Sequence, residues 1–209
     1  RGSKDGQKTA VRRRQTSQVP EPTSATTRLQ TGTGSQGRPS MGAGCGYGLG
    51  SECRDLPGFV VINGGLIPPG GLDNFNSGFM PASYQGSIFT AANPPVANIN
   101  RTEPTDQLQK NKLALLKKLD EQRLAATGKN GAVESAIANY ELAYRMQTVV
   151  PGLTDLKDES PATQQLYGLD SKFQHKASFA RQCLLARRWV ERGGRFIEAG
   201  YLVTIIARR

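Results

Sequence analysis

The spacing of apolar and polar residues predicts one buried strand, then a long irregular segment, then a run of helices. The run Phe59-Val60-Val61-Ile62 is rich in β-branched residues and lies between Gly58 and Gly64, which is typical of a buried strand. Regular periodicity then stops for about forty residues, because Pro68-Pro69-Gly70-Gly71 excludes both a helix and a central strand. Helical spacing begins at about residue 105.

Residues 56–104 begin with this strand, and the irregular part that follows it has the composition of an ordered loop. It carries almost no charge, whereas disordered chain is usually charged and poor in aromatic residues. Ordered loops of this length are uncommon and often cover a binding site. We expect a folded loop held in place by Phe75, Phe79, Tyr84, Ile88 and Phe89.

Two helices joined by a short glycine-containing turn follow the loop. The first begins after the capping residue Thr105 and ends at Gly128. The second runs from about residue 132 to 150 and is predicted to stop before Pro151-Gly152. Helices joined this closely form an antiparallel hairpin. The apolar face of the first helix consists of Leu108, Leu115, Leu119 and Ala126, with Leu116 beside them.

The last third of the chain predicts two more helices and a strand. Ser160-Pro161 begins a short helix that ends at Gly168. Another helix spans about residues 177–192, and Gly193-Gly194 separates it from a strand at 195–198. This order is one unit of an α/β sheet. The residues of the last helix predicted to face the core are Phe179, Cys183, Ala186 and Val190.

Positive charge is concentrated at the two ends of the chain. The net charge is +10, made up of +6 in residues 1–40, −3 in residues 41–171 and +7 in residues 172–209. Residues 1–30 are polar and without periodicity, so we expect them to be disordered. The three cysteines form no CxxC pair, which predicts neither a disulfide framework nor a zinc cluster. Residues 201–207, the longest apolar run, are too short to span a bilayer.

Several segments resemble a bacterial protein family, domain of unknown function 1501. These are residues 38–42 and 47–52, the loop itself, and residues 134–141 and 182–188. The resemblance covers about residues 31–198 and leaves residues 199–209 as a divergent tail. It implies an α/β fold, namely a partial domain of the sulfatase-like kind in the alkaline-phosphatase superfamily, with a long Gly/Pro-rich loop and a helical hairpin.

The resemblance also implies a chemistry. Complete relatives would hydrolyse phosphoric or sulfuric esters with a divalent metal held by Asp and His ligands, and would be exported by the twin-arginine route. Their His-Asp-x-x-His arrangement is absent from residues 1–30, and the only histidine, His175, lies in a polar segment where we expect it to be exposed. We therefore assign this chain no catalytic residue, no metal ligand and no cofactor, and expect it to be inactive by itself.

The remaining candidates for a binding site lie in the loop. Asn63, Asp73, Asn74, Asn76 and Tyr84 are polar residues in a glycine-rich setting of low charge. Such groups can line a pocket and orient a ligand, here a small ester substrate of the complete protein. The alternative is that asparagine and aspartate in glycine-rich turns bond to their own backbone.

Two other functions stay open. The basic ends, residues 1–38 and 181–209, would suit a module that binds nucleic acid or an anionic surface, although partners of that kind are disfavoured because the ends lie outside the resemblance. The chain would otherwise be a non-catalytic interaction domain, with an exposed apolar patch around Phe75, Phe79 and Tyr84.

Overall fold

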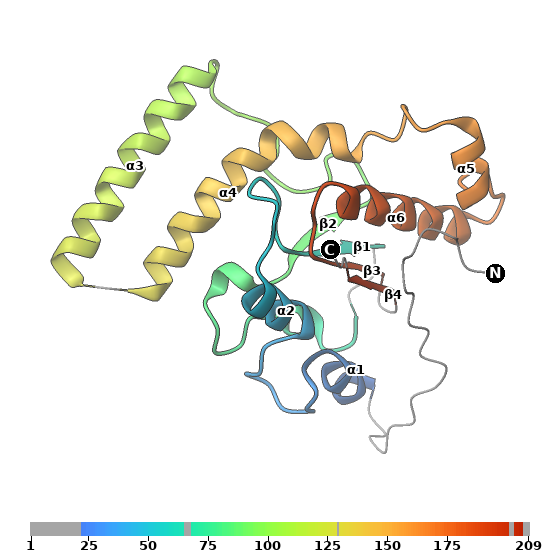
Figure 1. Ribbon diagram of the computed structural model, residues 1–209, viewed down its shortest axis with the longest axis horizontal. Helices are drawn as coiled ribbons and strands as arrows, with labels where there is room; N and C mark the ends of the chain where they lie inside the picture. Colours follow the sequence, from blue (N-terminus) through green and yellow to red (C-terminus); the bar gives the residue numbers. More distant parts are fainter. Residues whose placement is uncertain (1–21, 65–67, 129, 201–202, 207–209) are drawn as a thin grey trace.

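The computed structural model describes residues 22–64, 68–128, 130–200 and 203–206 of the 209-residue chain. Within these residues the fold is mixed α/β, with one sheet of strand order β2-β1-β3-β4 (Figure 1). β1 (Phe59–Asn63) runs parallel to both β2 (Ser87–Thr90) and β3 (Phe196–Ala199), and β4 (Val203–Ile206) runs antiparallel to β3. The strand expected at residues 59–62 is confirmed.

The main core lies between the sheet and α6 (Gln174–Glu191). Val60 and Ile62 of β1 face this side, because alternate residues of a strand point to opposite faces. Trp189 of α6 packs on Phe89 of β2, with ring centroids 4.7 Å apart. Both side chains are almost completely buried, so this pair fixes the helix against the sheet.

The opposite face of the sheet is covered by α1 (Pro22–Thr31), α2 (Met41–Leu49) and the short helix η1 (Gly71–Phe75). Phe59 packs edge-on against both Phe196 and Phe75 here. A Cβ at Gly42 would lie 2.6 Å from the Phe59 ring. Helix α2 therefore requires glycine at this position to come so close to the sheet.

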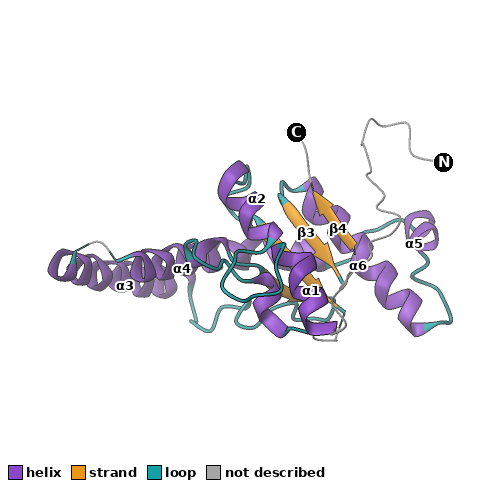
Figure 2. Cartoon of the chain, turned by 90° about the horizontal axis from the view of Figure 1, so that it is seen from below, coloured by secondary structure: helices purple, strands orange, loops and turns teal. Residues whose placement is uncertain are grey.

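Helices α3 (Asp106–Thr127) and α4 (Gly131–Thr154) form the predicted hairpin. The hairpin extends away from the sheet, as Figures 1 and 2 both show. Thr105 caps α3 by accepting a hydrogen bond from the backbone N–H of Leu108, and Gly128 ends it, as predicted. Near the body, Gln109 donates a hydrogen bond of 2.7 Å to Gln147 across the two helices.

Helix α4 does not stop before Pro151, as we predicted, but continues to Thr154 with the proline inside it. Val150 and Leu153 are fully buried in the main core. Burial of these two side chains on the same face outweighs the backbone hydrogen bond that Pro151 cannot make. The rule that proline disfavours a helix interior describes the local cost correctly, but it did not predict where α4 ends.

The last helices follow in the predicted order, but the buried face of α6 differs from the prediction. α5 (Pro161–Tyr167) begins and ends as expected, whereas α6 begins at Gln174, three residues early. Of the four residues predicted to face the core, Ala186 is fully buried, Cys183 and Val190 are half-buried, and Phe179 is 44% exposed. The buried face is instead built from Ala180, Gln182, Leu184, Leu185, Ala186 and Trp189.

Two further expectations need correction. Helix α1 begins at Pro22, so disorder is wrong for residues 22–30, while residues 1–21 lie outside the described residues. Strand β2 lies within the segment predicted to be irregular, where residues 87–90 pair with β1. Propensity missed both elements because each is short and is stabilised by packing on parts of the chain that are distant in sequence.

Candidate functional site

The strand order places a candidate site at the carboxyl ends of the parallel strands. β1 lies between its two parallel neighbours, β2 and β3. The chain leaves β1 toward β2 on one side and later returns to β3 on the other side, so the strand order reverses direction at β1. In open α/β sheets, ligands bind outside the carboxyl ends of the strands at such a point. The residues at these ends are Asn63-Gly64 after β1, Ala91 after β2 and Gly200 after β3. We call this region the carboxyl edge.

Gln182 of α6 lies over the ends of β1 and β3. A Cβ at Gly64 would lie 2.5 Å from its Nε2, and a Cβ at Gly200 would lie 3.4 Å from its Oε1. Gly64 therefore leaves room for this amide, whereas a Cβ at Gly200 would make only ordinary contact with it and glycine is favoured there by its positive φ of 63°. The side chain is almost fully buried, and its Oε1 has no hydrogen-bond partner among the described residues. A buried amide with spare capacity can accept a ligand contact.

Arg181, next to Gln182, brings a positive charge to the end of β2. Its Nε donates a hydrogen bond of 2.8 Å to the carbonyl oxygen of Ala91. That bond uses one donor of the five on the guanidinium group. The guanidinium group of Arg181 favours an anionic ligand at this edge.

A cluster of buried polar side chains lies on the opposite face of the sheet, under α1. Glu198 of β3 is 1% exposed and accepts a hydrogen bond of 2.6 Å from Nε2 of Gln30 on α1. Its other oxygen, Oε2, has no partner among the described residues. One turn away on α1, Thr27 donates to Oδ1 of the buried Asn74 at 3.3 Å. These bonds attach α1 to the sheet and to η1.

Burial raises the pKa of Glu198 to about 7, although the hydrogen bond from Gln30 acts in the opposite direction. The carboxyl group is therefore about half protonated near pH 7 and largely neutral about one pH unit below it. A neutral carboxyl group adds no negative charge at the end of β3, next to the carboxyl edge.

The residues predicted from the sequence to bind a ligand lie on three different elements. Asn63 ends β1 and is part of the carboxyl edge. Asp73 and Asn74 belong to η1, and Tyr84 belongs to η2 (Ala82–Tyr84). Asn76 directly follows η1. The structure therefore places one of the five at the edge and does not bring the others to it.

Asn74 and Asn76 hydrogen-bond to the backbone of their own loop, which is the alternative to ligand binding. Asn74 donates to the carbonyl oxygens of Pro69 and Gly71, which closes the loop around η1. Asn76 accepts a hydrogen bond of 2.6 Å from the backbone N–H of Gly78, two residues further along the chain. These two side chains hold the loop in shape.

Asp73 and Tyr84 contact residues from other elements. Asp73 is exposed and accepts a hydrogen bond from Gln36 at 3.1 Å. The Tyr84 ring packs edge-on against Tyr47 of α2. Whether either residue contacts a ligand stays a prediction.

Sequence reasoning missed the three residues that define the two polar regions, namely Arg181, Gln182 and Glu198. Glu198 had a signal in the sequence, since it is a charged residue between apolar ones in the run Phe196-Ile197-Glu198-Ala199. Arg181 and Gln182 had none, because on an amphipathic helix they cannot be distinguished from surface residues without the sheet.

The residues present do not fit a divalent metal ion. In the part of the chain that the structure describes, no three His, Cys, Asp or Glu side chains are close enough to hold one. Glu198, which lies on β3 itself, has the amide of Gln30 as its partner. His175 is exposed, as predicted. Cys45, Cys53 and Cys183 are free and half-buried.

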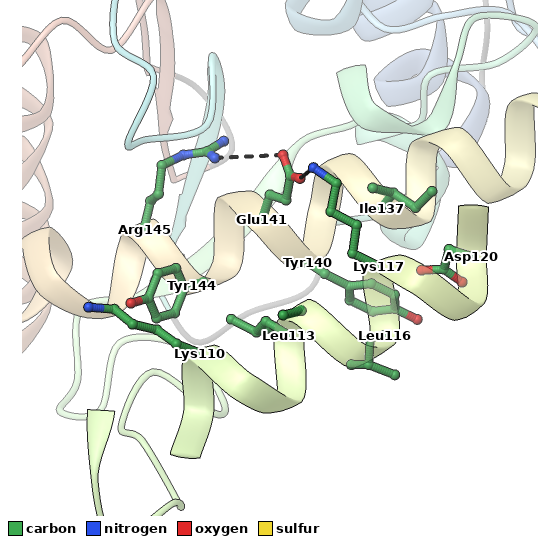
Figure 3. A pocket seen from close by; sticks show the side chains of 11 residues that line it. Lys110, Leu113, Leu116, Lys117, Asp120, Ile137, Tyr140, Glu141, Tyr144 and Arg145 are labelled. Carbon is green, nitrogen blue, oxygen red and sulfur yellow. Dashed lines mark ion pairs between the residues drawn. The ribbon is translucent and has the colours of Figure 1, made fainter. Parts of the chain in front are cut away.

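A second concave surface lies between the two helices of the hairpin (Figure 3). It has a volume of about 230 Å³, and Leu113, Leu116, Ile137 and Tyr140 are among its lining residues. Lys117 forms an ion pair with Glu141 at 3.7 Å, and Arg145 forms another with Glu141 at 3.9 Å. Lys110, Asp120 and Tyr144 also line this surface.

The apolar patch expected around Phe75, Phe79 and Tyr84 does not form. Phe75 is buried against Phe59, Tyr84 is half-buried, and only Phe79 is strongly exposed, at 79%. No helix in the described ranges has both the length and the apolar content required to cross a bilayer. Binding of nucleic acid through the basic ends stays a prediction, since residues 1–21 lie outside those ranges.

Fold and site together define an α/β protein with a small, mainly parallel sheet and a polar site at its carboxyl edge. The chain belongs to the family described as protein of unknown function DUF1501, whose model matches residues 3–201. The match is wider than the predicted 31–198 and includes most of residues 1–30. No curated protein and no solved structure matches the chain.

Proposed function

We propose that the carboxyl edge binds the anionic group of a phosphoric or sulfuric ester, and that the chain is part of a sulfatase-like protein of the alkaline-phosphatase superfamily. The observation that carries the proposal is the position of Arg181 and Gln182 over the ends of β1, β2 and β3. The resemblance of the sequence to sulfatase-like proteins supports the same class of ligand. By the same resemblance, the protein is exported from the cytoplasm.

Arg181 and Gln182 would have different tasks at this site. The guanidinium group supplies positive charge and N–H donors that match the oxygens of a phosphate or sulfate. The Gln182 amide supplies a further N–H donor or, with the amide reversed, an acceptor for a hydroxyl of the ligand. Asn63, at the end of β1, is placed to contact the same ligand.

This chain alone would bind such an ester without hydrolysing it. Ester hydrolysis in the superfamily needs a metal that polarises the ester and activates a nucleophile. The described residues offer no cluster of ligands for that metal, so no hydrolytic step is assigned to them. The divalent metal would belong to complete relatives.

The binding test is a calorimetric titration with p-nitrophenyl phosphate and with p-nitrophenyl sulfate. We expect Arg181→Gln to weaken binding about 10-fold or more, because a charged hydrogen bond is lost. Gln182→Leu should weaken it by a smaller factor. Arg192→Gln is the matched control, since Arg192 is exposed at the other end of the same helix. Equal binding by all four proteins, or no binding by the unmodified chain, would reject the proposed site.

The turnover test uses the same two esters with added Mg²⁺, Mn²⁺, Zn²⁺ or Ca²⁺. We expect no release of p-nitrophenol above the rate without protein. Robust, metal-dependent turnover would show that the chain has a catalytic centre that the described residues do not reveal.

A further inference from the structure

Helix α3 has an apolar face that no other part of the described chain covers. Leu108, Leu115 and Leu119 are 50%, 59% and 52% exposed. Leu116 of the same helix and Tyr140 of α4 are also exposed, and both line the groove between the two helices. These five residues form what we call the hairpin patch. Lys117 of α3 pairs with Glu141 of α4 across this groove (Figure 3), which Leu108, Leu115 and Leu119 do not line.

The spacing of this face is symmetric along the helix. Leu108, Leu115, Leu119 and Ala126 follow one another at intervals of seven, four and seven residues. Intervals of seven and four keep side chains on one seam of a helix, as in coiled coils. Because the order of intervals is the same in both directions, a copy of α3 turned end to end presents the same seam. Leu115 of one copy then faces Leu119 of the other, and Leu108 faces Ala126.

We propose that the hairpin patch is the contact surface of a homodimer, in which two α3 helices pack antiparallel about a two-fold axis. A two-fold dimer joins the same patch on both copies, so it requires a self-complementary surface of this kind. The proposal is independent of the ligand proposed for the carboxyl edge.

The size of the hairpin is sufficient for such a contact. α3 has 22 residues and is therefore about 33 Å long, and two helices side by side are about 20 Å wide. With α3 and α4 both in the contact, one face of the hairpin thus offers about 650 Å², and two copies together about 1,300 Å², which is within the range of specific interfaces.

Residues 1–21 of the same chain are a poor alternative occupant. Their only large apolar residues are Val11 and Val19, and they contain six arginine or lysine residues. The patch itself is bordered by cations. Lys112 is paired with Glu103 of its own chain at 2.6 Å, while Lys118 is exposed. A second copy would bring like charges together, so added salt should strengthen the dimer by screening them.

Sedimentation equilibrium over a range of protein concentrations, at about 0.1 M and 0.5 M NaCl, tests the proposal. The chain of 22.5 kDa should show twice this mass, with tighter association at the higher salt concentration. The variant Leu115→Asn/Leu119→Asn should be monomeric with an unchanged circular dichroism spectrum, since both positions are exposed. Leu166→Asn, at a leucine that is 83% exposed on α5, should dimerise like the unmodified chain.

The orientation can be tested by disulfide cross-linking. A mixture of Leu108→Cys and Ala126→Cys chains should form a mixed cross-linked dimer. Leu108→Cys chains alone should form no more cross-linked dimer than the unmodified chain does. A monomer at both salt concentrations would overturn the proposal, whether or not that monomer binds phosphatidylcholine vesicles or a synthetic amphipathic helix. Dimers that persist in the double variant would overturn it too.

Discussion

At the scale of single residues, Glu198 is the most unusual group in the sheet. Its position on β3 faces α1, between Val61 of β1 and Thr204 of β4 in the register of the strands. One oxygen is bonded to Gln30, and the other has no partner in the described structure. Burying a carboxyl group with a single neutral partner stabilises its protonated form. The stability of the chain should therefore depend on this one proton.

Glu198→Gln should remove most of that dependence. The pKa rises from 4.5 in the unfolded chain to about 7 in the fold, so between these pH values the folded state holds a proton that the unfolded state has lost. Stability therefore falls as the pH rises from 4.5 to 7, by about 3 kcal/mol in total. Urea unfolding at pH 5 and pH 8 would show this fall in the unmodified chain and little of it in the variant.

The control for this measurement is Glu121→Gln, at an exposed carboxyl group on α3. It should leave the difference between pH 5 and pH 8 as it is in the unmodified chain. If Glu198→Gln behaves in the same way as this control, Glu198 is not the buried proton-binding group described here.

Two glycines allow the cost of a positive φ to be measured separately from the cost of a steric clash. Gly71 and Gly78 both have a positive φ, of 65° and 59°. A Cβ at Gly71 would meet nothing within 4 Å, whereas one at Gly78 would lie 2.6 Å from the backbone carbon of Arg38 and would also clash with the nitrogen of Pro39. Gly71→Ala should cost about 1 kcal/mol from φ alone, and Gly78→Ala clearly more, because residues 37–39 would have to move.

Chemical unfolding of the two variants measures this difference. Equal losses of stability would contradict the close approach of the loop to residues 37–39.

At the scale of elements, the helices show which features of the sequence determine local structure. Caps and breakers placed α3 and α5 correctly, because Thr105, Gly128, Ser160 and Gly168 act on their own neighbours. The end of α4 and the buried face of α6 were wrong, because both depend on contacts with the core. β2 was missed for the same reason, since four residues carry little periodicity without the strand with which they pair.

Pro151 allows a test of whether core packing outweighs the missing backbone hydrogen bond at the end of α4. The proline is exposed and lies in the last turn, so Pro151→Ala restores a backbone N–H without removing a buried contact. We expect the free energy of unfolding to rise by about 1–2 kcal/mol. Gly152→Ala is the control, with an expected gain of at most about 1 kcal/mol. Loss of stability in Pro151→Ala, measured by thermal unfolding, would contradict the continuous helix.

At the scale of the whole molecule, the sheet determines where a ligand can bind. The sequence predicted an α/β class and one residue of the carboxyl edge, Asn63. It could not predict Arg181 or Gln182 as part of a site, because their role arises only when α6 lies over β1 and β3. The strand order is a property of pairing between distant segments, and one sequence does not show it.

Nuclear magnetic resonance of the ¹⁵N-labelled chain during a titration with inorganic phosphate tests the anion site most directly. The account predicts that the largest shifts of backbone amide signals occur at Asn63-Gly64, Ala91, Arg181-Gln182 and Gly200, and that they disappear in Arg181→Gln but persist in Arg192→Gln. Shifts confined to the hairpin or to exposed lysines, or no saturable shifts at all, would contradict it.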